Sequence, residues 1–572
     1  MRRRAFAAFL SVCFLCSNIF AQNPKPVTQM PKEEVEPFKI SRGVSFSAST
    51  PRRSNQTEKR GAEIPPDRIV ADYREALQLI RENYVDGKRL DYNQLAKSSI
   101  TAMLRTLDPH SNFYTPREYR ELLDEQRSEY TGIGASIANY TFKGVTDTYI
   151  TSTFPDSPAN RAGLRFGDKI VAVNGVPMTG KTSFYVREQI RGEKGKIVRL
   201  TIERASSLQT ETLEIRRNVV TSPSIPDAYM LRPGIGYIDF SEGFNYTTVE
   251  ELEKAIANLH RHGMNSLILD LRNNPGGILE QAVKVAEKFL GAGQIIVSQR
   301  GRFAIDNRVW KSANRNPEKM PLVVLVNGSS ASASEIVAGA LQDYDRALIV
   351  GENTFGKGLV QSVINLPLGA GLTLTTAKYY TPSGRSIQRD YSDGNIYDYF
   401  RHKVEYKTNP KFAGKTITGR IVYGGNGIMP DEAVPAPLIT DSQIALLDPI
   451  FFFTREITAG RIEGLENYKQ TRGIIFNQRV RPSDFPPSEK LFSAFQKYLK
   501  ETEPEKASNL EANKKFILNR IRYHLATAKF GSITANQVLI EEDPQVAKAV
   551  EALPKAQTLA QAAQKSLQNR NK

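Results

Sequence analysis

Cysteine is almost absent from this sequence. The chain has two cysteines, Cys13 and Cys16, and both lie within its first 21 residues. Beyond that segment no side chain can form a disulfide bond, supply a thiolate to a metal ion or act as a cysteine nucleophile. The sequence therefore excludes a disulfide-stapled fold, a cysteine metal site and cysteine-dependent catalysis in the rest of the chain.

Long apolar runs are missing as well. The candidate run covers residues 5–16, after arginines at positions 2–4 and shortly before the small residue Ala21. A membrane-spanning helix needs ~20 apolar residues, whereas this pattern is typical of a signal peptide. We therefore predict a cleaved signal peptide over residues 1–21 and an exported protein of the bacterial periplasm or cell envelope. An uncleaved anchor is the alternative.

Acidic residues are fewer than basic ones. The chain has 77 Lys and Arg against 61 Asp and Glu, a formal charge of +16. Without residues 1–21, which hold three arginines and no acid, the balance is 74 against 61, or +13. Basic runs with interleaved aromatics, typical of nucleic-acid-binding proteins, do not occur. We expect no nucleic-acid partner, and a solvated basic surface that attracts acidic partners or membranes.

The length of 572 residues is enough for several domains. Residues 22–65 are rich in Pro, Ser, Thr, Lys and Glu, which predicts a flexible linker. Apolar residues at helical spacing predict a helical region over 66–130. Short strands and turns over 131–207 predict a β-rich module. Residues 208–445 form the next predicted domain, and 446–572 a helical C-terminal extension.

Apolar strand-like runs alternate with helical patterns between about residues 230 and 385, which predicts an α/β layer with largely buried strands. The expected strands cover 235–240, 267–271, 295–297, 322–326 and 347–350. The expected helices cover 248–261, 278–290 and 333–343.

A serine-rich segment, NGSSASASEI at 327–336, follows a predicted buried strand and opens a predicted helix. Small residues there allow a nucleophile to protrude, and a helix N-terminus places N–H groups near developing negative charge. Ser332 and Glu335 also fit a capping box, which needs no catalysis. Both interpretations stay open on this segment alone.

A glycine-rich segment, GENTFGKG, follows at 351–358. It resembles a phosphate-binding P-loop, but Gly358 stands where serine or threonine must hold magnesium. The alternative is a desolvated Lys357 whose neutral amine accepts a proton from a serine; a solvated loop lysine is the third interpretation. None of the five histidines has a setting typical of a catalytic base, so we predict a Ser-Lys pair.

These segments together resemble the carboxyl-terminal processing peptidases, also called tail-specific proteases. The resemblance covers about residues 66–435. The matching segments are 107–111 (LDPHS), 270–277 (DLRNNPGG), 327–336 (NGSSASASEI), 355–361 (FGKGLVQ), 380–387 (YTPSGRSI) and 427–431 (GIMPD). Ser329 and Ser330 precede the matching serine as extra hydroxyls, and the C-terminal extension matches no motif.

The resemblance implies roles for residues at the matching positions. Ser332 would be the nucleophile and Lys357 its general base, later the acid for the leaving amine. Gln361 would orient the lysine. Arg272 and Asn273 would shape their loop.

An oxyanion hole is implied as well, built from the N–H of Ala333 and that of Gly276 or Gly277. Glycine lets a backbone amide approach the oxygen closely. The resemblance leaves open which of the two glycines donates.

The β-rich module at 131–207 resembles the PDZ domain of the same family. Gly132, Ile133, Gly134 and Ala135 would form the loop that binds a peptide carboxylate. The strand after them would pair with an extended peptide. A tight turn without a ligand is the alternative.

The implied protein is a multidomain α/β serine endopeptidase with a crotonase-like core, a PDZ module and helical N- and C-terminal regions. It would cleave proteins that have free C-terminal tails, and no metal or other cofactor is expected. A homodimer and an adaptor protein stay open as partners. The alternative function is a catalytically inactive, peptide-binding scaffold of the cell envelope.

Overall fold

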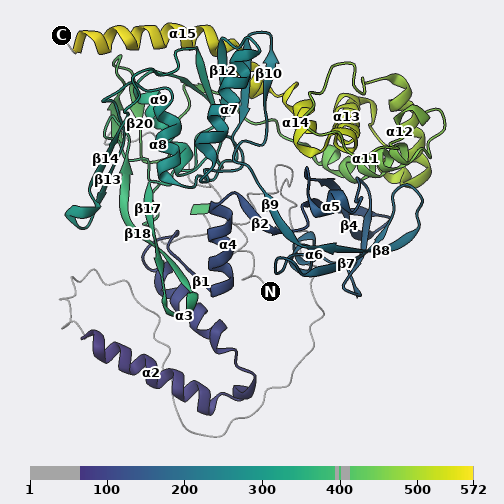
Figure 1. Ribbon diagram of the computed structural model, residues 1–572, viewed down its shortest axis with the longest axis horizontal. Coiled ribbons are helices and arrows are strands. Elements are labelled where there is room, and N and C mark those ends of the chain that lie inside the picture. The colour runs from purple at the N-terminus through teal and green to yellow at the C-terminus, as the bar shows by residue number, and fades with distance from the viewer. Residues whose placement is uncertain (1–64, 393–398, 401–411, 571–572) are drawn as a thin grey trace. The chain divides into compact units, whose positions relative to one another are not determined.

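The computed structural model describes residues 65–392, 399–400 and 412–570 (Figure 1). The predicted signal peptide lies outside the described residues, as does the predicted linker except for Pro65. The described chain divides into two compact units, with the boundary along the chain between residues 103 and 104. The smaller unit contains helix α2 (Pro66–Asn83) and most of α3 (Tyr92–Arg105), which confirms the helices predicted there.

The larger unit begins with the β-rich module. Its sheet has the strand order β3-β4-β5-β7-β8, so β3 lies at an edge of the sheet. The strands are β3 (Ala135–Phe142), β4 (Val145–Thr153), β5 (Lys169–Val173), β7 (Ile197–Glu203) and β8 (Thr210–Arg216), and β6 (Val176–Pro177) pairs with β5. Two helices accompany them, α5 (Pro158–Arg161) and α6 (Ser183–Ile190). Strands β2 (Glu129–Gly132) and β9 (Asn218–Thr221) pair where the chain enters and leaves the module.

The predicted α/β layer is a six-stranded sheet with the order β10-β11-β12-β15-β16-β21. Its neighbouring strands are parallel except for β10 against β11. The strands are β10 (Ala228–Arg232), β11 (Ile235–Asp239), β12 (Ser266–Asp270), β15 (Leu322–Val326), β16 (Leu348–Gly351) and β21 (Glu432–Ala433). Apolar residues point to both faces, as buried parallel strands require.

Different helices cover the two faces of this sheet. Helices α7 (Thr248–Arg261), α8 (Leu279–Glu287) and α9 (Ala333–Asp343) pack on the face that carries Leu267, Leu269 and Val324. The other face carries Ile268 and Leu325 and is covered by α15 (Pro544–Arg570), the last helix of the described chain. The C-terminal end of the chain therefore takes part in the core of the α/β layer.

A second, antiparallel sheet has the order β1-β18-β13-β14, with β17 paired to β18. Its strands are β1 (Asn112–Tyr114), β13 (Ile295–Gly301), β14 (Arg308–Lys311), β17 (Leu359–Asn365) and β18 (Gly371–Tyr380). The expectation that 295–297 belongs to the α/β layer is wrong, because β12 pairs directly with β15 and leaves no place between them. The hairpin β17–β18 was not predicted.

The C-terminal extension is helical, as predicted. Helices α11 (Asp441–Ala459), α12 (Glu489–Thr502) and α13 (Lys514–Phe530) share an apolar core, and α14 (Ser532–Ile540) leads to α15. Helix α11 also contacts β3: the rings of Tyr140 and Phe451 stack at 3.6 Å, and Thr141 donates its N–H to Asp448 over 3.1 Å. Within the described ranges, no helix has the length and apolar content needed to cross a bilayer.

Candidate active site

The serine-rich segment forms a sharp turn between β15 and α9. Ser332 is the last residue before α9 and has φ +56°, which is uncommon for a residue with a side chain. A nucleophile on a strained strand-to-helix turn projects its hydroxyl out of the sheet. Ser332 is half-buried, and its own N–H donates to the carboxylate of Glu335 in the first turn of α9.

The neighbouring serines have structural partners. Ser330 is fully buried and donates its hydroxyl to the carbonyl of Leu271 over 2.7 Å. Ser334 is also buried and donates to the carbonyl of Asn274 over 3.0 Å. Ser329 is exposed. Ser332 differs from these three serines in its place, because it is the residue at the turn itself, directly before α9.

Lys357 lies on the segment between β16 and β17. Burial lowers the pKa of the Lys357 amine to about 8. The nearby carboxylates of Asp108 and Glu335 act in the opposite direction and raise this pKa. Its Nζ donates to Oε1 of Gln361 in β17 over 3.0 Å. The segment continues into a strand and not into a helix, so the P-loop interpretation is wrong.

A carboxylate joins the serine turn to the lysine segment. Glu335 is fully buried and accepts the N–H groups of Ser332 and Lys357, each over 2.8 Å. It also accepts the N–H of Gly356 over 2.7 Å and the hydroxyl of Thr354 over 2.6 Å. Burial raises the pKa of Glu335, and these four donors oppose the rise. The sequence predicts a helix-capping role for Glu335 but not its hydrogen bonds to the lysine segment.

The bridge joins the backbones of the two predicted catalytic residues, Ser332 and Lys357. Among the described residues, no hydrogen bond joins Ser332 Oγ to Lys357 Nζ. Catalytic hydrogen bonds are often long or poorly aligned without substrate and shorten when it binds. The structure thus places a desolvated amine and a serine at a strained turn on two segments whose backbones bind one carboxylate.

The glycine loop that follows β12 contacts the serine turn. Gly276 has φ +99°, and a Cβ there would lie 2.8 Å from the Cβ of Ser332 and 2.9 Å from the nitrogen of Ala333. Gly277 has φ +142° and lies against the backbone of Phe244. Neither position accepts a side chain without a shift of the backbone.

Asn274 holds this glycine loop in place through two hydrogen bonds. Its Oδ1 accepts the N–H of Gly276 over 2.9 Å, and its carbonyl accepts the N–H of Ala331 over 2.9 Å. Gly276 is buried, whereas Gly277 is exposed. The loop therefore presents the backbone of Gly277 to solvent beside the serine turn.

The predicted carboxylate loop of the PDZ module is divided between two elements. Gly132 ends β2 and pairs with Asn218, so it belongs to a strand pair rather than to the loop. Gly134 has φ +75°, Ile133 precedes it, and Ala135 begins the edge strand β3. The turn is held by the N–H of Ala159, which donates to the carbonyl of Ile133 over 2.7 Å.

Two residues near Lys357 were not predicted as parts of the site. Asp108 accepts the Ser111 hydroxyl over 2.6 Å and favours the charged form of Lys357. The His110 ring nitrogen Nε2 lies 2.8 Å from the hydroxyl of Tyr399. Burial, with the charges of Lys357 and Arg389, lowers the pKa of His110 well below its usual range. Both residues belong to the segment LDPHS at 107–111, whose match to the peptidase family could have indicated a place near the site.

Comparisons with known proteins agree with this geometry. Models of peptidase family S41 and of the PDZ domain match residues 234–397 and 149–204. The carboxy-terminal-processing protease of Bartonella bacilliformis is 37% identical over 327 residues, which are 56% of this chain and 72% of that protein. The carboxyl-terminal-processing protease of a Picosynechococcus species is 34% identical over 54% of this chain and 74% of its own.

A solved structure, the photosystem II D1 C-terminal processing protease, is 28% identical and covers 65% of this chain and 94% of its own, with a TM-score of 0.34. The two sequence relatives each match over more than two thirds of their length. The resemblance seen in the motifs is thereby confirmed, and the chain belongs to the carboxyl-terminal-processing serine proteases of peptidase family S41, with a PDZ domain.

Proposed function

We propose that this protease cleaves polypeptides near their C-termini with Ser332 as nucleophile and Lys357 as general base. The observation that carries the proposal is the carboxylate of Glu335, which binds the backbone N–H of both residues and so fixes their spacing. The lowered pKa of Lys357 supports it further, because about one amine in ten is then neutral at pH 7.

The reaction follows from these roles. Ser332 Oγ attacks the scissile carbonyl carbon while its proton passes to Lys357 Nζ, which gives a tetrahedral oxyanion and an ammonium group. The ammonium then protonates the leaving amine as the C–N bond breaks, which leaves an ester on Ser332. Water attacks this ester and gives a proton to Lys357. Lys357 returns that proton to Ser332 Oγ as the ester C–O bond breaks, which releases the new carboxyl end and restores both groups. Gln361 keeps the amine in place throughout.

For the oxyanion hole we assign the N–H of Ala333 and that of Gly277. The N–H of Gly276 is bound to Asn274 Oδ1. Among the described residues, the N–H groups of Gly277 and Ala333 have no hydrogen-bond partner. Donors that are already oriented and unbonded stabilise the developing charge without reorganisation.

The PDZ module would receive the substrate's free C-terminus. The turn at Ile133 and Gly134 precedes β3, whose outer edge is open for a further strand over most of its length. A peptide that adds to such an edge gains main-chain hydrogen bonds whatever its sequence. The substrates would be proteins with free tails in the periplasm or cell envelope, consistent with the basic N-terminal signal pattern.

Loss of cleavage in two variants tests the proposal. Ser332→Ala and Lys357→Ala should each abolish cleavage of a tailed substrate and keep the parent's circular dichroism, because each removes an essential group without adding volume. Ser329→Ala, a change at an exposed serine in the same segment, should cleave like the parent. Undiminished cleavage by either of the first two variants would contradict the assignment.

Labelling with a serine-reactive phosphonate addresses the alternative of an inert scaffold. We expect stoichiometric labelling of the parent and none of Ser332→Ala. Membership of a serine protease family argues against the inactive scaffold. A parent protein that is not labelled would favour the scaffold instead.

A further inference from the structure

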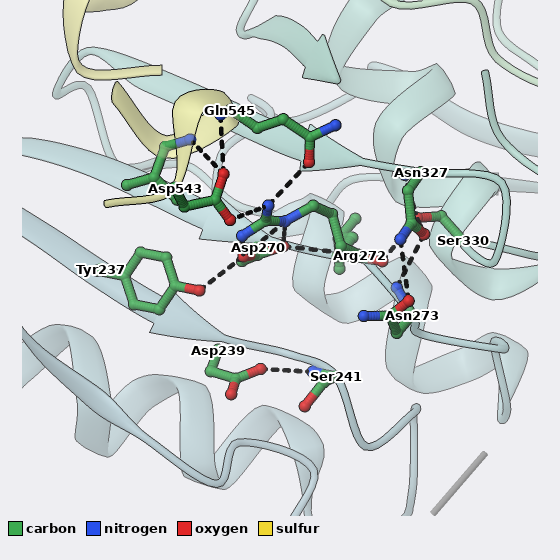
Figure 2. Close-up of polar contacts among 12 residues, drawn as sticks. Tyr237, Asp239, Ser241, Asp270, Arg272, Asn273, Asn327, Ser330, Asp543 and Gln545 are labelled. Carbon is green, nitrogen blue, oxygen red and sulfur yellow. Dashed lines mark hydrogen bonds and ion pairs between the residues drawn. The ribbon is translucent and has the colours of Figure 1, made fainter. Parts of the chain in front are cut away.

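Arg272 stands at the start of the glycine loop, directly beyond β12. Its Nε and Nη2 bind the carboxylate of Asp270 over 2.9 and 2.6 Å (Figure 2). Asp270 in turn accepts the hydroxyl of Tyr237 over 2.6 Å. The guanidinium is therefore anchored to the sheet on one side, and its side chain is only 11% exposed.

The other side of this guanidinium is held by the C-terminal extension. Nη1 of Arg272 donates to Asp543 Oδ2 over 2.6 Å and to Gln545 Oε1 over 2.8 Å (Figure 2). Both partners lie at the start of α15, more than 270 residues along the chain. Asp543 Oδ1 also accepts the N–H of Gln545 over 2.8 Å, and Gln545 Nε2 donates to the carbonyl of Val434 over 2.7 Å.

The residues that follow Arg272 connect it to both halves of the catalytic centre. Asn273 donates its N–H to Asn327 Oδ1 over 3.0 Å, and Asn327 Nδ2 donates to Asn273 Oδ1 over 2.9 Å. Asn327 begins the serine turn, and Gly277 ends the glycine loop. The two Asn273–Asn327 hydrogen bonds therefore tie the loop that begins at Arg272 to the segment that carries Ser332.

We propose that Asp543 and Gln545 are positioning residues of the active site, so that the C-terminal extension supports the oxyanion hole through Arg272. This inference rests on the proposed function. Their side chains hold Arg272 from the side opposite to Asp270 and fix the glycine loop in the conformation that receives the tetrahedral intermediate. The docking of α15 itself rests on apolar contacts of Val546 and Leu553 with the sheet, which these polar groups do not supply.

The test is the exchange Asp543→Asn in the full-length chain. Asparagine keeps the oxygen that caps α15 but removes the charge that pairs with Arg272. We expect kcat to fall by about 10-fold or more with KM within about 2-fold of the parent. Affinity for a peptidyl boronate, a transition-state analogue, should fall by the same factor as kcat/KM.

Two further variants make the result specific. Lys555→Ala removes another ion pair of α15, with Glu432, at an exposed position away from the loop, and should leave kcat unchanged. Gln545→Ala should lower kcat in the same sense, and it replaces Asp543→Asn as the test if that variant does not fold.

Three outcomes decide the matter. A parent that does not cleave overturns the proposed function and this inference together. An active parent with an unchanged kcat and boronate affinity in folded Asp543→Asn overturns this inference alone. Equal losses of kcat in Asp543→Asn and Lys555→Ala would also overturn it, because they would show a general weakening of α15.

Discussion

At the scale of single residues, the buried carboxylate of Glu335 organises the catalytic centre. Burying a charge is costly unless donors surround it, and here the donors come from the serine turn and from the lysine segment alone. The carboxylate is therefore stable only when both segments are in place. This makes the spacing of Ser332 and Lys357 a property of the folded core.

Exchange of this carboxylate should uncouple the two segments. Glu335→Gln keeps the shape but replaces one acceptor oxygen by an NH2 donor that faces N–H groups. We expect the free energy of unfolding to fall by about 1–3 kcal/mol and kcat by about 10-fold or more, measured by urea unfolding and steady-state kinetics. Glu280→Gln, at an exposed position of α8, is the control. A parent-like kcat in Glu335→Gln would contradict the bridge.

Individual residues differ in how far the sequence alone identifies them. Ser332 and Lys357 stand in short motifs with small residues around them, so their type and spacing suffice. In the sequence, Glu335 is fully explained as a helix-capping residue. Nothing in the local pattern therefore indicates its contact with the lysine segment. Asp108 and His110 lie about 250 positions from Lys357, and a contact over that separation has no local pattern.

At the scale of elements, the apolar runs predict β11, β12, β15 and β16 well because these strands are buried on both faces. The strand β18 is not predicted by apolar runs, because threonine and glycine alternate there with apolar residues. The strand β13 was found but placed in the wrong sheet. An apolar run indicates that a strand is buried. It does not indicate which strands pair with it, because pairing depends on the path of the whole chain.

The turn before β3 offers a matched pair of substitutions within the PDZ module. Gly134 and Gly144 have φ +75° and +79°, but a Cβ at Gly134 would lie 2.3 Å from the Cβ of Ser157, whereas one at Gly144 would meet open space. We expect Gly134→Ala to weaken binding of a free-carboxylate peptide by about 10-fold or more, measured by fluorescence anisotropy.

Gly144→Ala should bind that peptide like the parent, because its strain is confined to a hairpin turn. A C-terminally amidated peptide should bind the parent weakly. Equal binding of the amidated and free peptides would contradict the assignment of this turn to carboxylate recognition.

At the scale of the whole molecule, the chain returns at its end to the α/β layer. Helix α15 buries Val546 and Leu553 against sheet residues such as Ile268, Val323 and Leu325. Burying a side chain of valine or leucine contributes about 1.5–3 kcal/mol, which is a large part of the typical stability of a domain, about 5–15 kcal/mol. The sequence predicts the helix but not the sheet on which it packs.

Removal of this helix should therefore destroy the catalytic domain. A chain that ends at residue 542 would expose one face of the parallel sheet, and we expect it to aggregate or to unfold well below the parent's melting temperature in a thermal scan. A chain that ends at residue 564 keeps the residues of α15 that pack on the sheet and should melt like the parent. A soluble, active chain ending at 542 would contradict this account.

The most direct test of the central claim is the pH dependence of Ser332 acylation, measured as the rate of labelling by a peptidyl phosphonate. Lys357 accepts a proton only when neutral, so the rate should rise about tenfold per pH unit below an apparent pKa near 8 and level off above it. In Lys357→Ala the labelling should be lost. Labelling that persists in Lys357→Ala with the same profile, or that instead follows an ionisation removed by His110→Ala, would contradict the Ser-Lys mechanism.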